Sequence, residues 1–386
     1  MRLRTLFAGS FLATLAVFAL PLARKALHAP VRELAEKFPL KRLFIDVNGG
    51  AYRVAGRRWC NEVYRAPEGT LLSELKGPRK MDASVARTAA FARGLKARGV
   101  PFLYVQTPAK IDRAGSMLPP GFFHRGNDRA DAFLAGLGEK GVRTIDLRDA
   151  LTATPQDVVS NFYVGDHHWN NDTVFRVFGS LALELARELG FASAVVEPFI
   201  SADSWNREVW PQCFMGTKTR RTGRLFGGLD DLAVYTPQFA TDLSIEIPSK
   251  GIRLSGDFRK TIMRCSGQIR EGGSDGFGRD AYSLLYVGGT YGVVRHKNRA
   301  APLTRRVMII GDSYVRPLEA MLSTVVSDLL VLDQRRFAPG ETVAGFVESF
   351  KPDLVLQLNN PSTFGADTLS GPKAHQSVLF TYGKLE

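Results

Sequence analysis

The sequence is poor in cysteine and histidine. Among its 386 residues there are three cysteines and six histidines. Three cysteines cannot all pair within one chain, and the wide separation of Cys60, Cys213 and Cys265 identifies no disulfide, although one could form in an oxidising compartment. Their spacing is also unlike that of a metal site. We therefore expect no bound metal and no cofactor.

Long hydrophobic runs are almost absent. The segment from Leu6 to Leu22 is nearly all apolar and lies between two pairs of basic residues close to the N-terminus. Its length falls between that of a signal-peptide core and that of a membrane-spanning helix. Residues 1–29 are therefore predicted to be either a signal peptide or an uncleaved anchor in the inner membrane. Both alternatives imply export, so the rest of the chain should be periplasmic or otherwise extracytoplasmic.

Acidic residues are outnumbered by basic ones. The chain has 51 lysines and arginines against 38 aspartates and glutamates, a net charge of +13, which favours anionic partners. The basic residues accompany no nucleic-acid-binding motif, so acidic polysaccharide or lipid headgroups fit better than nucleic acid. The run from Lys218 to Arg224 holds four basic residues. It could face an anionic glycan, although a solvated surface is the more common role of such a run.

The pattern of apolar residues predicts the fold class. The chain is 45% hydrophobic and long enough to bury a large core. Helical and strand patterns alternate as βαβ units require, which predicts a doubly wound, mainly parallel α/β sheet. Strands are expected at 102–107, 142–147, 307–311, 329–333 and 354–358, and helices at 81–98, 128–138, 173–189, 315–327 and 341–350.

The alternation breaks between about residues 196 and 300. Glycine-rich segments there, such as Gly272 to Gly278, predict short strands and loops. We interpret this interval as a β-rich insertion that covers the site and recognises a substrate. The predicted organisation is the N-terminal segment, an extension over residues 30–80, and one α/β domain over residues 81–386 that contains the insertion.

A strand that leads into a serine-containing turn is the best-placed chemical motif. Val307 to Ile310 is an uninterrupted apolar run, and Gly-Asp-Ser follows it, which predicts a buried parallel strand that opens into a tight turn. Pro317 suits the first turn of the next helix. Ser313 would then lie where open α/β sheets bind ligands and where backbone N–H groups can stabilise an oxyanion. The alternative is a serine that only caps the helix.

A second motif, GDHHW at residues 165–169, supplies a carboxylate and an imidazole. It precedes an amphipathic helix with capping candidates at Asn170 to Asp172. Asp166 can fix the tautomer of His168, whose ring would then face the hydroxyl of Ser313. These three side chains complete the set of groups for serine-nucleophile acyl transfer. Taken alone, a histidine in a loop is usually structural or solvent-facing.

Four segments together resemble a known family. They are GDHHWNNDTVF, PQCFMGTKTRRTGRLFGGLDDLAVYTP, SLLYVGGTYGVVRHKN and IIGDSYVRPLEAML. The resemblance runs from about residue 95 to residue 365 and is to the DHHW family of bacterial proteins, which is similar to the SGNH-hydrolase-like domain of the alginate O-acetyltransferases. It implies an exported α/β domain that attaches or removes O-acyl groups, usually acetyl, on a cell-surface or secreted polysaccharide.

The resemblance also implies a role for each residue of the two motifs. The acetyltransferases carry an Asp-x-His pair upstream of a Gly-x-Ser strand, which corresponds here to Asp166, His168 and Ser313. Ser313 would be the nucleophile, His168 the general base and then the general acid, and Asp166 the orienting carboxylate. In ordinary SGNH hydrolases the serine comes first and an Asp-x-x-His pair last, so the order here is permuted.

Three further residues are candidates for the oxyanion hole or for substrate contact. SGNH enzymes take donors from the nucleophile's own N–H, from a glycine and from an asparagine after a later strand, and the matching residues here are Asn359 and, more weakly, Gly289. Asparagines also end strands, and glycine pairs mark turns. Lys110 follows the strand at 102–107 and could orient a carboxylate or a sugar. A solvated loop lysine is the alternative.

The sequence thus predicts an exported serine-nucleophile O-acetyltransferase that modifies a polysaccharide. Proteins of this kind often receive acyl groups from a membrane-bound O-acyltransferase partner. One alternative is a polysaccharide O-acetylesterase with the same acyl-enzyme, and another is an inactive glycan-binding protein. A metal-dependent phosphoesterase is disfavoured, because the remaining histidines form no recognisable ligand cluster with residues 166–168.

Overall fold

The computed structural model describes residues 40–76, 80–271, 281–364 and 380–385. The predicted signal peptide or anchor at residues 1–29 and the glycine-rich segment at residues 272–278 lie outside these ranges. Within the ranges, no helix is both long enough and apolar enough to cross a membrane.

The predicted α/β sheet is present, with eight strands among the described residues. Five neighbouring strands are mutually parallel, and the other three pair antiparallel with their neighbours. The carboxyl ends of the parallel strands therefore meet at one edge, where sheets of this kind bind ligands. The order across the sheet is β5 (Thr144–Asp146), β4 (Phe102–Gln106), β13 (Leu354–Asn359), β11 (Leu303–Gly311), β12 (Val326–Leu332), β10 (Val293–Asn298), β8 (Leu243–Ile247) and β9 (Ile252–Gly256).

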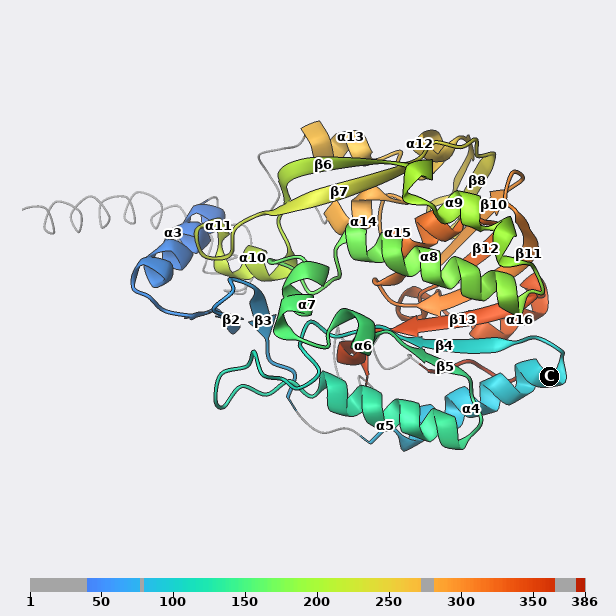
Figure 1. Ribbon diagram of the computed structural model, residues 1–386, viewed down its shortest axis with the longest axis horizontal. Coiled ribbons are helices and arrows are strands. Elements are labelled where there is room, and N and C mark those ends of the chain that lie inside the picture. The colour runs from blue at the N-terminus through green and yellow to red at the C-terminus, as the bar shows by residue number, and fades with distance from the viewer. Residues whose placement is uncertain (1–39, 77–79, 272–280, 365–379, 386) are drawn as a thin grey trace, which may run out of the picture.

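The central strands are apolar throughout because both faces of the sheet are covered. Val307 and Ile309 pack into the core on one face, and Met308 and Ile310 pack into the core on the other. Figure 1 shows helices on both sides of the sheet. One core includes α8 (Asn171–Glu188) and α15 (Val315–Leu322), and the other includes α4 (Asp82–Ala97), α5 (Gly126–Glu139) and α16 (Val343–Phe350).

The predicted helix at 315–327 is too long. α15 ends at Leu322, and β12 begins at Val326, earlier than the predicted strand at 329–333. The side chains of Ser323 and Thr324, which follow the helix, explain the early stop, because both bond to nearby backbone carbonyls. The hydroxyl of Thr324 donates to the carbonyl of Met321 at 2.7 Å, and a side chain that bonds to nearby backbone in this way offers the chain an alternative to continued helix.

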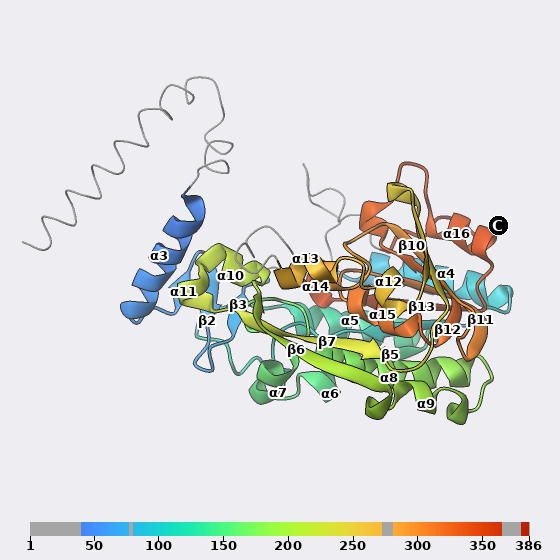
Figure 2. The same cartoon turned by 90° about the horizontal axis from the view of Figure 1, so that it is seen from above.

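Part of the predicted insertion belongs to the main sheet. The strands β8, β9 and β10 all come from residues 196–300, yet they extend the sheet beyond β12. The same interval contains a long antiparallel hairpin of β6 (Trp205–Phe214) and β7 (Asp230–Pro237), visible in Figures 1 and 2. The short helices α10 (Thr217–Thr222) and α11 (Arg224–Gly227) lie between its strands. The other α-helices in the described part of residues 81–386 are α6 (Arg148–Leu151), α7 (Pro155–Asn161), α9 (Glu197–Ile200), α12 (Phe258–Thr261), α13 (Ser266–Glu271) and α14 (Ala281–Leu285).

The N-terminal extension packs against this insertion. Its helix α3 (Lys41–Val54) contacts α10 and α11, and the three lie together in Figures 1 and 2. The carboxylate of Asp46 on α3 accepts hydrogen bonds from the backbone N–H of Arg224 at 2.6 Å and from its Nε at 2.9 Å. All three cysteines of the chain are free. The extension contains α3 (Lys41–Val54) and a sheet of β1 (Trp59–Cys60), β2 (Val63–Arg65) and β3 (Leu71–Ser73).

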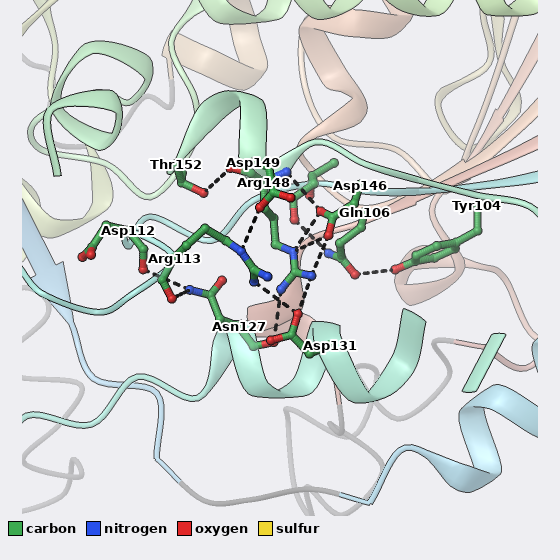
Figure 3. Close-up of polar contacts among 11 residues, drawn as sticks. Tyr104, Gln106, Asp112, Arg113, Asn127, Asp131, Asp146, Arg148, Asp149 and Thr152 are labelled. Carbon is green, nitrogen blue, oxygen red and sulfur yellow. Dashed lines mark hydrogen bonds and ion pairs between the residues drawn. The ribbon is translucent and has the colours of Figure 1, made fainter. Parts of the chain in front are cut away.

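A buried arginine fixes the loop that follows β4. The guanidinium of Arg148 lies 2.7 Å from Asp131 Oδ1 and 2.7 Å from Asp146 Oδ2, and it donates to the carbonyl of Asn127 at 3.2 Å (Figure 3). The amide of Asn127 in turn donates to the carbonyl of Asp112 at 3.0 Å. These contacts join β5, α5 and the loop after β4 into one unit.

Candidate active site

Ser313 lies in the turn between β11 and α15, at the carboxyl edge of the sheet. β11 ends at Gly311, where an added Cβ would lie 2.3 Å from the side chain of Val315, so the turn needs a glycine. The carboxylate of Asp312 accepts a hydrogen bond from the backbone N–H of Asn360 at 2.7 Å. This contact ties the turn that carries Ser313 to the residue that follows β13.

Asp166 and His168 lie in a loop that is closed at its base. Phe162 and Trp169 form an antiparallel bridge across it. The side chain of Asn170 caps the N-terminus of α8, as the sequence predicted. The loop is therefore held between α7 and α8 at both of its ends.

The structure brings together the three residues that the sequence proposed as nucleophile, base and orienting carboxylate. The Nε2 atom of His168 lies 2.7 Å from the Oγ of Ser313, and its Nδ1 lies 2.6 Å from the Oδ1 of Asp166. Asp166 and His168 are only 1% and 3% exposed. The imidazole thus bridges a carboxylate and a hydroxyl in a site shielded from solvent.

The carboxylate of Asp166 is held by further hydrogen bonds. Its Oδ1 also accepts the backbone N–H of His168 at 3.0 Å, and its Oδ2 accepts that of Thr217 at 2.6 Å. Burial opposes its ionisation, but His167 and His168 outweigh that effect, so the pKa of this carboxyl lies well below its ordinary value. An ionised carboxylate at Nδ1 favours the tautomer of His168 whose Nε2 accepts the proton of Ser313.

Lys110 supports the loop from inside. It is 5% exposed, and its ammonium donates to the carbonyls of Tyr163 at 2.5 Å, Val164 at 2.7 Å and Asp166 at 2.9 Å. Burial, with a contribution from Lys218, holds its pKa well below the ordinary value. The three N–H groups of the ammonium thus satisfy the three carbonyl oxygens. The interpretation as a solvated loop lysine is therefore wrong, and these bonds do not involve a carboxylate or a sugar.

The predicted insertion also contacts the loop. The backbone N–H of Lys218 donates to the carbonyl of Gly165 at 2.9 Å. The carboxylate of Asp230 accepts the backbone N–H groups of Val164 at 2.6 Å and Gly165 at 2.8 Å. At Gly216 an added Cβ would lie 2.3 Å from the carbonyl oxygen of Gly165, so the two segments approach too closely for a side chain. The connection between β6 and β7 and the first residue of β7 thus position the Asp-x-His pair.

Two tyrosines that the sequence did not single out flank His168. The ring of Tyr282 stacks on the imidazole with centroids 4.1 Å apart and planes 16° apart, and its hydroxyl accepts a hydrogen bond from Trp169 Nε1 at 3.0 Å. The hydroxyl of Tyr314 donates to the carbonyl of His167. The position of Tyr314 directly after the candidate nucleophile was a signal for it. Tyr282 had none, because its place beside the imidazole depends on the packing of α14.

The two oxyanion candidates differ in their surroundings. Asn359 is fully buried; its Oδ1 accepts from Gln357 Nε2 at 2.8 Å, while its Nδ2 has no hydrogen-bond partner in the described part of the chain. Gly289 has a φ of 145°, and an added Cβ would lie 3.0 Å from the hydroxyl of Tyr291. Its conformation is that of a turn glycine, and no hydrogen bond among the described residues connects it with Ser313.

A cavity of about 230 Å³ lies beside the loop of the Asp-x-His pair. Its wall includes His167 and Tyr314, which are the chain neighbours of His168 and Ser313. The wall also includes His124, Lys218, Asn360 and Ser362. We call this space the side cavity.

The motif also has the chemistry of metal ligands. Asp166, His167 and His168 offer ligand atoms that all lie within 4.8 Å of one another. Both ring nitrogens of His168 are, however, already hydrogen-bonded to Asp166 and Ser313. In the described ranges, no other group of three histidine, cysteine or acidic residues has metal-site geometry. A cation at this place would therefore compete with the contacts of the imidazole.

Comparison with known proteins agrees with this architecture. Residues 68–202 match the family described as SGNH hydrolase-like domain, acetyltransferase AlgX. The structure of Bacillus cereus PatB1 superposes with a TM-score of 0.63 at 17% identity, over 83% of this chain and 99% of that one. The chain has the SGNH-hydrolase-like fold. The resemblance inferred from the sequence is therefore confirmed.

Two further structures share this SGNH-hydrolase-like fold. PatB1 with a sulfonyl adduct gives a TM-score of 0.62 at 17% identity, over 83% of this chain and 100% of that one. A DHHW family protein from Eubacterium siraeum gives 0.56 at 15% identity, over 80% of this chain and 91% of that one. No curated protein sequence matches closely enough to count as a relative. The matched family region includes Asp166 and His168, whereas Ser313 lies beyond it.

Proposed function

We propose that this SGNH-hydrolase-like protein is an exported O-acyltransferase that transfers acyl groups, typically acetyl, to a cell-surface or secreted polysaccharide. The observation that carries the proposal is the pair of short contacts of His168, at 2.7 Å to Ser313 Oγ and at 2.6 Å to Asp166 Oδ1. A hydroxyl, an imidazole and a carboxylate in this order are the parts of a serine-nucleophile site.

The first half of the proposed reaction forms an acyl-enzyme. His168 Nε2 takes the proton of Ser313 as Oγ attacks the acyl carbonyl of the donor, and the carbonyl oxygen becomes an oxyanion. His168 then gives that proton to the leaving oxygen of the donor as the carbon–oxygen bond breaks. Asp166 remains ionised throughout and stabilises the imidazolium, consistent with its lowered pKa.

The second half repeats these steps with the acceptor. His168 removes the proton from a sugar hydroxyl, whose oxygen attacks the acyl carbon, and the proton returns to Ser313 Oγ as the acyl bond to the enzyme breaks. The backbone N–H of Ser313 and the Nδ2 of Asn359 are the proposed donors to the oxyanion. Asn359 is the better side-chain candidate because its Nδ2 has no other acceptor among the described residues.

Transferase and esterase differ in whether a sugar or water resolves the acyl-enzyme. The side cavity favours transfer, because its wall includes the chain neighbours of His168 and Ser313 and offers room and polar groups for an acceptor. The family description as an acetyltransferase domain supports the same choice. An O-acetylesterase and an inactive glycan-binding protein are the alternatives that the experiment below separates from it.

The proposal includes an extracytoplasmic location and an acyl donor from the membrane. The apolar run from Leu6 to Leu22 supports export. A membrane-bound O-acyltransferase partner would deliver the acyl group to Ser313, because the proposed chemistry needs an activated donor and an exported protein has no access to the soluble donors of the cytoplasm.

The experiment incubates the full-length chain with 4-nitrophenyl acetate and records its intact mass, beside the variants Ser313→Ala and His168→Ala. A single acetyl group on Ser313, absent from both variants, is the expected result. Phenylmethylsulfonyl fluoride should modify the same residue, in line with the sulfonyl adduct carried by PatB1. Transfer of the acetyl group to added oligosaccharide distinguishes a transferase, and release to water an esterase. If wild type forms neither adduct, the proposal fails and the glycan-binding alternative replaces it.

A further inference from the structure

The charged side chains around the side cavity are neutralised, with one exception. The ammonium of Lys110 is bonded to three backbone carbonyls. Glu74 pairs with Lys76 at 2.7 Å, and Arg221 pairs with Glu62 at 2.7 Å. The exception is Lys218, whose Nζ has no hydrogen bond or ion pair with any described residue.

Lys218 is held in place although its charge is unpaired. It is only 7% exposed, and its backbone N–H is bonded to the carbonyl of Gly165 at 2.9 Å. The preceding residue, Thr217, donates its N–H to Asp166 Oδ2 at 2.6 Å. The stem of Lys218 is therefore fixed relative to the same loop that carries His168, so whatever its ammonium binds is positioned relative to the reacting groups.

A largely buried ammonium without a hydrogen-bonded or ion-paired partner is costly, and an anionic ligand would lower that cost. Burial lowers the pKa of Lys218 to about 8, so the side chain still carries its charge at pH 7. Burial lowers the pKa of both His124 and His167 to about 4, which keeps these rings neutral at pH 7. Lys218 is thus the one cation of this wall without a hydrogen-bonded or ion-paired partner among the described residues, although the carboxylate of Asp166 attracts its charge.

We propose that Lys218 binds a carboxylate on the acceptor saccharide and thereby selects acceptors that carry an acid group. This inference rests on the proposed function and names the chemistry of its acceptor. A single ammonium with neutral neighbours, such as the side chains of Asn360 and Ser362, suits a monoanion. A phosphate is usually met by several charged or backbone donors, and Lys218 is the one unpaired cation that the described residues place in this wall.

The test measures binding without turnover. The full-length Ser313→Ala chain is titrated calorimetrically with tetragalacturonic acid, its methyl ester, the neutral tetramer of N-acetylglucosamine and maltotetraose phosphate. The titrations are repeated after Lys218→Met and, as a matched loss of charge on the same helix outside the cavity, Arg220→Met. We expect the acid to bind at least about tenfold more tightly than its methyl ester. We expect that advantage to disappear with Lys218→Met and to persist with Arg220→Met.

Several outcomes would overturn the inference. They are equal binding of the acid and the methyl ester, an acid preference that survives Lys218→Met, a preference for the phosphate, and no binding of the acid at all. The proposed function fails separately. If the acid binds through Lys218 but wild type forms no acyl adduct, the carboxylate site stands and the acyl transfer does not. If the adduct forms without any role for Lys218, the reverse holds.

Discussion

The ring of Tyr282 lies almost flat against the imidazole of His168, with centroids 4.1 Å apart and an angle of 16° between the planes. Tyr282 comes from α14, and its hydroxyl accepts a hydrogen bond from Trp169 Nε1 at 3.0 Å. The imidazole is thus restrained by hydrogen bonds along its two nitrogens and by a ring on one face. An aromatic ring in this position also favours the imidazolium that forms when His168 takes a proton.

Loss of the stacked ring should slow acylation more than loss of its hydroxyl. We expect Tyr282→Ala to lower the rate of acyl-enzyme formation by up to about tenfold, because a stacked ring contact is worth up to about 1.5 kcal/mol. Tyr282→Phe keeps the ring and gives up the hydroxyl contacts with Trp169 Nε1 and with the carbonyl of Tyr314, so its rate should stay within about threefold of wild type. The burst of 4-nitrophenolate measures both. Equal rates for the two variants would show that the stacking has no kinetic role.

Replacement of the orienting carboxylate should remove most of the activity. In Asp166→Asn the side chain no longer favours the required tautomer of His168, and we expect acylation to fall about 10³-fold or more. Stopped-flow absorbance follows the reaction. Asp128→Asn, which alters a carboxylate on the surface of α5, should leave the rate unchanged. An Asp166→Asn enzyme with more than a tenth of the wild-type rate would contradict the assigned role.

The loop around Asp166 should depend on Lys110 for its stability. Lys110→Met removes the donor to three carbonyls while it keeps much of the apolar stem, and each buried acceptor left without a partner costs about 1–3 kcal/mol. We expect the free energy of unfolding to fall by about 3 kcal/mol or more. Urea denaturation measures the change, with Lys140→Met on the surface as the control. Comparable stability of the two variants would mean that these hydrogen bonds are energetically unimportant.

Asn359 should matter for acylation if its amide stabilises the oxyanion. Asn359→Ala is expected to lower the acylation rate about 10²-fold, the usual effect of removing one such donor. The affinity for a saccharide acceptor, measured in the Ser313→Ala background, should remain unchanged. A wild-type acylation rate in this variant would leave the oxyanion to backbone donors alone.

His296 should make the protein sensitive to acid. It is fully buried in β10, and neither ring nitrogen has a hydrogen-bond partner among the described residues. Burial, with Arg316 nearby, lowers its pKa to about 3, whereas in the unfolded chain the pKa is about 6.5. At a pH between these two pKa values, His296 is protonated in the unfolded state but not in the folded state. The free energy of unfolding therefore decreases as the pH falls from about 6.5 towards 3.

The variant His296→Leu tests this. We expect it to be more stable than wild type by about 1 kcal/mol at pH 7, because two unpaired buried nitrogens are removed. It should also lose less stability than wild type when the pH is lowered from 7 to 5. Urea denaturation at both values gives the comparison, and an identical loss in the two proteins would rule out His296 as the source.

The strands that carry the candidate site could be predicted from local sequence. Val307 to Ile310 is apolar without interruption because neighbouring strands and helices cover both of its faces, and that pattern is specific for a central parallel strand. The strands β8 and β10 were not recognised as members of the sheet. Their alternating residues fit a separate hairpin equally well, and only long-range pairing with β12 decides between the two arrangements.

The reacting groups could be proposed from sequence, but their supports could not. Ser313 and the Asp-x-His pair stand in motifs whose chemistry is visible in the residue types. Lys110 was named as a candidate to orient a carboxylate or a sugar, but its bonds to the loop could not be predicted, because its three acceptors lie 53, 54 and 56 residues away. Lys218 was grouped with its basic neighbours as part of a solvated run, whereas the packing of α10 against the loop buries it.

The contacts of Gly165 with Lys218 and Asp230 limit how this protein can be engineered. A chimera that exchanged residues 205–237 for those of a relative, in order to change the acceptor, would also replace the groups that hold the loop of His168. The exchanged segment would then alter both the rate of the acyl-transfer step and the choice of acceptor. Independent tuning of the two requires grafts that carry residues 162–169 along with the hairpin, or single changes confined to side chains such as Lys218 that face the cavity.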